Sequence, residues 1–139
     1  MSDVAVDPVR ALAGVLRELP NQLDIEALTS HHFCAGLYVR ELFVPADSCI
    51  VGKTHATQNF FLLVKGEMTV TTDQGPVRIR APYMAITQPG TKRAGYAHED
   101  CVCLNIHANP DDAQDLAVLE ARYITPEALP APEKKELLT

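Results

Sequence analysis

The chain has 139 residues, an apolar fraction of 47% and a formal net charge of −6. The length suits one globular domain with a substantial core, and the composition argues against wholesale disorder. The acidic balance argues against non-specific binding to nucleic acid or to an anionic membrane, because both require positive charge. We therefore expect neither kind of partner.

The beginning of the chain does not resemble a signal peptide, because no unbroken apolar stretch follows a basic start in residues 1–20. Four cysteines are too few and too widely spread for a disulfide framework: Cys34, Cys49, Cys101 and Cys103. Both features predict a cytoplasmic protein.

A helix is predicted near the N-terminus, where Asp7 can cap a segment that begins with Pro8 and ends at Pro20. Apolar residues recur at helical spacing in between, at Val9, Leu12, Leu16 and Leu19. We assign residues 1–30 to an N-terminal helical segment, whose apolar stripe packs on a sheet or on a partner subunit.

From residue 31 the apolar pattern alternates, which is typical of β-strands. Tyr38, Arg40, Leu42 and Val44 share one face of the first strand. Further strands are predicted over residues 59–64, 68–72, 77–80 and 101–107, with a short one between Pro82 and Gln88. Many short strands with regular turns indicate a sandwich or barrel over residues 31–108.

A second helix is predicted over residues 109–125. Asn109-Pro110-Asp111-Asp112 is typical of a helix start, and Leu116, Leu119 and Tyr123 form one apolar stripe. The proline-punctuated residues 126–139 are predicted to be a flexible tail, and the whole chain to be a single domain.

Two spaced motifs resemble the signature of the cupin family. The first is Lys53-x-His55, three residues, Asn59, six residues, Gly66; the second runs from Pro82 through Gln88-Pro89-Gly90 to Arg93. The resemblance implies an all-β protein: an antiparallel jelly-roll barrel, here with short flanking N- and C-terminal helices. Cupins usually hold a metal at these positions with two histidines, a glutamate and a third histidine. The matching residues here are Lys53, His55, Asn59 and Arg93.

A narrower resemblance extends over His31–Phe33, Gly36–Glu41, Val51–His55, Pro89–Tyr96 and Ile106-His107. These stretches are similar to small stand-alone cupins encoded in tailed-phage genomes. That resemblance implies a viral origin and a place in the host cytoplasm, but no reaction.

The replaced motif positions predict a site for an anion. Lysine and arginine repel a divalent cation, so we expect no metal at the usual site and no cofactor. Basic side chains turned into a partly dry barrel mouth would instead bind a carboxylate or a phosphate. The candidate ligand-binding residues are Lys53, His55, Asn59, Arg93, Arg40 and Tyr38, and His55 is also the candidate catalytic residue.

Several alternatives stay open from the sequence. A metal-dependent dioxygenase, isomerase or lyase would hold iron, manganese, nickel or zinc at His55, with help from His31, His32, His98, His107 or Gln58. A metal-free isomerase would use His55 as general base, in the manner of the sugar epimerases that share the cupin fold. Arg40 could instead pair with Glu41 or Glu67, and Arg93 could lie solvated on the rim.

A non-enzymatic structural or interaction protein of phage origin is a further alternative. The apolar stripes of the two terminal helices would then serve assembly, and jelly rolls commonly pair, so we expect a homodimer. Whether the chain catalyses any reaction is left open.

Overall fold

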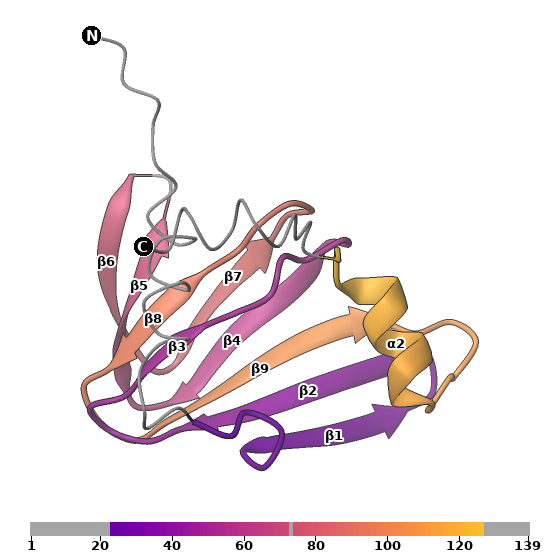
Figure 1. Ribbon diagram of the computed structural model, residues 1–139, viewed down its shortest axis with the longest axis horizontal. Coiled ribbons are helices and arrows are strands. Elements are labelled where there is room, and N and C mark those ends of the chain that lie inside the picture. The colour runs from indigo at the N-terminus through magenta and orange to yellow at the C-terminus, as the bar shows by residue number, and fades with distance from the viewer. Residues whose placement is uncertain (1–22, 73, 127–139) are drawn as a thin grey trace, which may run out of the picture.

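Two antiparallel sheets pack face to face in the computed structural model, which describes residues 23–72 and 74–126 (Figure 1). A five-stranded sheet has the order β1-β2-β9-β4-β7, and a four-stranded sheet the order β3-β8-β5-β6. The predicted all-β antiparallel architecture is confirmed. The elements are β1 (Thr29–Cys34), β2 (Leu37–Val44), β3 (Cys49–Val51), β4 (Asn59–Lys65), β5 (Glu67–Thr72), β6 (Gly75–Arg80), β7 (Tyr83–Thr87), β8 (Ala94–Ala97), β9 (Cys101–Ala108) and α2 (Leu116–Tyr123).

The strands begin and end close to the predicted bounds. The barrel starts at Thr29, two residues before the predicted boundary, and its last strand ends at Ala108. β1, β3 and β8 were not predicted individually. β3 and β8 have only three and four residues, which are too few to show an alternating pattern. The predicted N-terminal helix and the predicted flexible tail fall in residues 1–22 and 127–139, outside the described part of the chain.

Strand β9 organises the core because it pairs with β2 on one side and with β4 on the other. Cys103 lies opposite both Leu42 and Leu63, so these three side chains share the inner face. The apolar core spreads from this row across both sheets through Leu42, Val44, Phe61, Leu63, Met68, Val70, Ile79, Ala97, Cys101 and Cys103.

The outer face of the five-stranded sheet is also apolar. Val39, Ile106, Phe60 and Ile86 lie opposite one another across four strands. Phe60 is 42% exposed and Ile86 is 53% exposed, and nothing in the described chain covers them. Because both faces of the central strands are apolar, their sequences are nearly continuous apolar runs, as in sheets that are buried on both faces.

The predicted start of the C-terminal helix is wrong. The helix begins at Leu116, because the carboxylate of Asp115 accepts hydrogen bonds from Ala117 N and Val118 N. Asp112 instead adopts a left-handed conformation with φ of 51°, and its Oδ1 accepts a bond from Gly36 N. Residues 109–112 thus form a turn that is tied to the β1–β2 connection.

Helix α2 lies across the end of the five-stranded sheet, beside β9, β2 and β1 (Figure 1). Leu119 and Tyr123 are buried there against Tyr38, whereas Leu116 is exposed. The stripe that holds the helix in place is therefore narrower than predicted. Within the described ranges, no helix has the length and apolar character needed to cross a bilayer.

Gly66 is the turn residue most sensitive to substitution. Its φ is +94°, and an added Cβ would meet the carbonyl oxygen of Asp100 and lie 2.6 Å from Sγ of Cys101. We expect Gly66→Ala to lower the free energy of unfolding by about 3 kcal/mol, through backbone strain and a clash. Gly75→Ala is the matched control, because Gly75 has φ of +101° and open space around it; it should cost about 1 kcal/mol. Equal losses in urea titrations would contradict the clash.

Candidate functional site

The two motif loops are joined by backbone hydrogen bonds. Gly52 N donates to Arg93 O at 2.8 Å, His55 N donates to Thr91 O at 2.9 Å, and Gly90 N donates back to His55 O at 2.8 Å. These bonds bring His55 and Arg93, which are far apart in sequence, to the same end of the barrel.

Strand register adds polar side chains from the inner face at that end. Tyr38 on β2 lies opposite His107 on β9, and Arg40 lies opposite Asn105. On β4, Asn59 is buried and its Oδ1 accepts a hydrogen bond from Asn105 Nδ2 at 3.1 Å. Directly opposite residues of an antiparallel pair share a face, so all five side chains belong to one surface.

Helix α2 completes the site with an aromatic ring that the sequence did not predict there. The rings of Tyr123 and His107 stack with centroids 4.4 Å apart, and those of His55 and His107 are 6.2 Å apart. Tyr123 is fixed by its hydroxyl, which donates to Ala108 O, and by its carbonyl, which accepts from Ala56 N at 2.8 Å. The stack therefore holds the two imidazoles rigidly beneath the helix.

Two partly buried guanidinium groups face this stack without an acidic partner. Arg93 donates to Thr87 Oγ1, and its Cζ lies over the ring of Phe61, 5.4 Å from the ring centroid. Arg40 makes a long contact of 3.4 Å to Thr29 Oγ1. Within residues 23–72 and 74–126, neither guanidinium forms an ion pair with a carboxylate. Positive charge therefore gathers here without compensation from the described chain.

The surface pairing considered for Arg40 is not what the structure shows. Glu41 pairs with His32 at 2.9 Å. Glu67 forms ion pairs with Arg78 and with Arg80, the latter at 2.6 Å. Both carboxylates are thus engaged away from Arg40.

The surroundings keep both imidazoles neutral at pH 7. Burial, with smaller effects from His55 and Arg40, lowers the pKa of His107 to about 4. Burial, then the charges of Arg93 and Arg40, lower the pKa of His55. Burial also lowers the pKa of Arg93, which nevertheless stays charged. Among the residues that the structure describes, the site thus has cationic groups and neutral rings but no anionic side chain.

Hydrogen bonding inside the site is incomplete. The amide nitrogen of Asn59 lies 3.3 Å from His55 Nδ1 and also donates to Thr57 O at 3.1 Å. Among the described residues, two buried side-chain atoms have no partner, His107 Nδ1 and Thr57 Oγ1. Buried polar atoms are usually paired, so these two are exceptions within the described chain.

Lys53 does not belong to the site, contrary to the prediction. Its side chain is 60% exposed and forms an ion pair with Glu120 on α2. The motif spacing placed Lys53 correctly in the loop, but the position of the helix draws its ammonium group outward. The remaining predicted residues, which are His55, Asn59, Arg93, Arg40 and Tyr38, lie together around the imidazole stack.

Of the other histidines considered as partners for His55, His107 joins it in direct ring contact. His31 Nδ1 lies 2.7 Å from the Tyr38 hydroxyl at the sheet edge, and His98 Nε2 lies 2.7 Å from Thr69 Oγ1. His32 is paired with Glu41. Gln58, considered as an oxygen ligand, donates through its amide nitrogen to Gln88 Oε1 at 3.1 Å.

Sequence reasoning missed Asn105, Thr87 and Tyr123 as site residues. Asn105 is a polar residue on an otherwise apolar strand and shares the alternation of Cys101, Cys103 and His107, a signal that could have been read. Nothing in the sequence placed Tyr123 over a histidine.

The donor set does not fit a divalent cation. Within the described residues, no three histidine, cysteine or carboxylate side chains are grouped as metal ligands. The other polar side chains around His55 and His107 are neutral amides and two arginines, and the positive charges of the arginines repel a divalent cation. We therefore derive no chemistry through a metal at this position.

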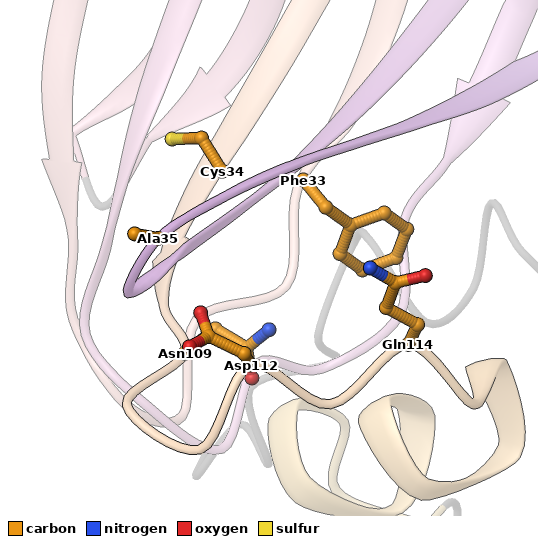
Figure 2. A pocket seen from close by; sticks show the side chains of 6 residues that line it. All are labelled: Phe33, Cys34, Ala35, Asn109, Asp112 and Gln114. Atoms are coloured by element: carbon orange, nitrogen blue, oxygen red, sulfur yellow. The ribbon is translucent and has the colours of Figure 1, made fainter.

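Two hollows are found among the described residues. One, of about 200 Å³, sits beside the β1–β2 turn and is lined by the six residues in Figure 2: Phe33, Cys34, Ala35, Asn109, Asp112 and Gln114. Figure 2 shows the Cys34 thiol pointing away from Phe33 and Gln114. The other, of about 260 Å³, is lined by apolar residues of the outer sheet face together with Gln58, Asn59 and His107. Neither hollow is lined by a basic residue.

Comparison with solved structures supports the fold. The chain is similar to a cupin superfamily protein from Desulfitobacterium hafniense, with 10% identity, a TM-score of 0.51, and coverage of 65% of this chain and 92% of that one. It is also similar to a protein with a double-stranded β-helix domain from Klebsiella pneumoniae, at 16% identity and a TM-score of 0.51, covering 61% and 78%. No protein-family profile and no curated protein matches the sequence. The chain has the cupin jelly-roll fold, and likeness at these identities shows the fold alone.

The neutral state of His107 predicts a loss of stability in acid. The unfolded ring takes up a proton near pH 6.5, whereas the folded ring does so only at about 4. The free energy of unfolding should therefore be constant above pH 6.5 on this account and fall between pH 6.5 and 4. In His107→Leu, unfolding should take up about one proton fewer in this range, so the free energy of unfolding should fall less steeply with decreasing pH. Denaturant titrations at several pH values measure the slope, and identical slopes for both proteins would refute the assignment.

Proposed function

We propose that this chain binds a small anionic molecule, a carboxylate or a phosphate, among the polar side chains at the helix-covered end of the barrel. The observation that carries the proposal is the pair Arg40 and Arg93, two partly buried guanidiniums without a carboxylate partner in the described chain. Charge taken from water without a counter-ion is unfavourable. An anionic ligand would supply that counter-ion.

Each side chain has a distinct part in this proposal. Arg93 offers a planar fork for two oxygens, and its contact with Phe61 fixes the plane. Arg40 adds a second positive charge from strand β2. The Tyr38 hydroxyl is neutral, because burial raises its pKa, and it would donate to the ligand by giving up its contact with His31 Nδ1. Low local dielectric strengthens all three interactions relative to water.

Catalysis by the same residues is a narrower form of this proposal. Neutral His55 could accept a proton from a bound carboxylic substrate, while Arg93 stabilises the negative charge that develops. A metal-free isomerase would need both features.

A phage origin and a cytoplasmic location also stay predictions that rest on sequence patterns.

The proposal predicts which substitutions remove binding. Thermal-shift screening of phosphates, nucleotides and dicarboxylates should give a stabilising ligand. Arg93→Gln and Arg40→Gln should each weaken its binding about tenfold or more, because each removes a charge-assisted hydrogen bond. Lys53→Gln is the matched control, since its ammonium group pairs with Glu120 at the surface. Unchanged affinity in the Arg40→Gln/Arg93→Gln double variant would contradict the proposal.

The metal-dependent alternative has an independent test. Elemental analysis of protein purified without a histidine tag would detect bound iron, manganese, nickel or zinc. Stoichiometric metal that is lost in His55→Ala would reverse the order of the two hypotheses.

A homodimer is our proposal for the outer face of the five-stranded sheet. Phe60, Met84 and Ile86 are exposed by 42%, 62% and 53%, and a second copy related by a two-fold axis would set the same apolar rows against each other.

Sedimentation should therefore show a dimer for the unmodified chain, and Ile86→Glu should convert it into a monomer. Val77→Glu serves as the control, because Val77 is similarly exposed, at 43%, on the other sheet. A monomeric unmodified chain would argue against the dimer.

A further inference from the structure

The ring of His107 is held firmly, but its Nδ1 atom has no partner. His107 is 3% exposed and stacks on Tyr123 and His55. Its Nδ1 is buried and unbonded in the described chain. A buried polar atom without a hydrogen bond is costly. The atom therefore marks a point at which a bound molecule would complete the hydrogen bonding.

The protonation state of the ring decides what that molecule must supply. The pKa of His107, lowered by burial to about 4, leaves the ring neutral at pH 7 with a single hydrogen. A buried N–H without an acceptor is rarer in proteins than a buried acceptor without a donor. We place the hydrogen on Nε2 for this reason, so Nδ1 is a bare acceptor that requires a donor.

The groups packed around the ring do not supply this donor. The Tyr38 hydroxyl is bonded to His31 Nδ1, and the Tyr123 hydroxyl donates to Ala108 O. The remaining titratable and charged groups are Arg40 on β2, Cys103 on β9, and His55 and Arg93 from the two motif loops, and each of them is engaged with another atom. A donor for Nδ1 therefore has to come from a bound molecule, and His107 itself lines the hollow of about 260 Å³.

We propose that the ligand is a phosphate that carries a proton, and that its P–O–H group donates to His107 Nδ1. This inference rests on the anion site proposed above. A protonated phosphate offers negative oxygens to the guanidiniums of Arg40 and Arg93 and a hydroxyl to the imidazole. Sulfate has the same shape and charge as hydrogen phosphate but no hydrogen at neutral pH. A bound sulfate would therefore set one of its acceptor oxygens against the acceptor Nδ1, and no hydrogen bond would form between them.

The experiment compares these two anions on the full chain. Isothermal titration at pH 7 and constant ionic strength should show inorganic phosphate binding at least about tenfold more tightly than sulfate, since the missing donor leaves a buried acceptor unsatisfied. Phosphate should also shift the ¹⁵N resonance of His107 Nδ1, and sulfate should not. Methyl phosphate loses its last proton with a pKa of about 6, so it should bind more tightly at pH 5.5 than at pH 8, relative to sulfate at each pH.

Two substitutions at one position isolate the acceptor. His107→Leu removes it, so phosphate and sulfate should then bind equally. His107→Asn keeps an oxygen acceptor at the δ position and should retain a preference for phosphate. The comparison on the unmodified chain decides the matter even if the leucine variant does not fold.

Equal binding of phosphate and sulfate to the unmodified chain, or tighter binding of sulfate, overturns this inference and leaves an anion site. Failure of phosphate, sulfate and dicarboxylates alike to bind overturns the proposed function with it.

Discussion

The pairing of β9 with both β2 and β4 is the constraint on which the rest of this structure depends. One register sets Cys103 against Leu42 and Leu63 in the apolar core. The same register sets His107 beside Tyr38, four residues further along the strand. A slip by one residue would turn every inward side chain of β9 outward. The interactions that stabilise the core therefore also fix the candidate site.

The site is polar because the inner face changes character along the barrel. Towards the helix-covered end, amides, imidazoles and guanidiniums replace the aliphatic side chains of the core. The chain compensates part of this polarity internally, through the Asn59–Asn105 and Asn59–His55 contacts. No carboxylate of residues 23–72 and 74–126 pairs with Arg40 or Arg93, and the charges of both arginines lower the pKa of His55. Such a combination opposes a cation and favours an anion.

Helix α2 changes the composition of the site in two ways. Glu120 on its outer side holds Lys53 at the surface, which removes a predicted ligand-binding residue. Tyr123 on its inner side packs on His107, which adds an aromatic wall. Both effects arise from where a short helix docks, and docking depends on contacts with strands that lie far away in the sequence.

The sequence by itself determined most of the strand pattern and the all-β class, because alternation and turn residues act over a few positions. It also identified His55, Asn59, Arg93, Arg40 and Tyr38 as candidates for one site. Only the tertiary structure decided that Lys53 points away, that His107 and Tyr123 join, and that the last helix starts at Leu116. These outcomes depend on cross-strand register and on helix docking, and no local pattern encodes contacts between residues so distant along the chain.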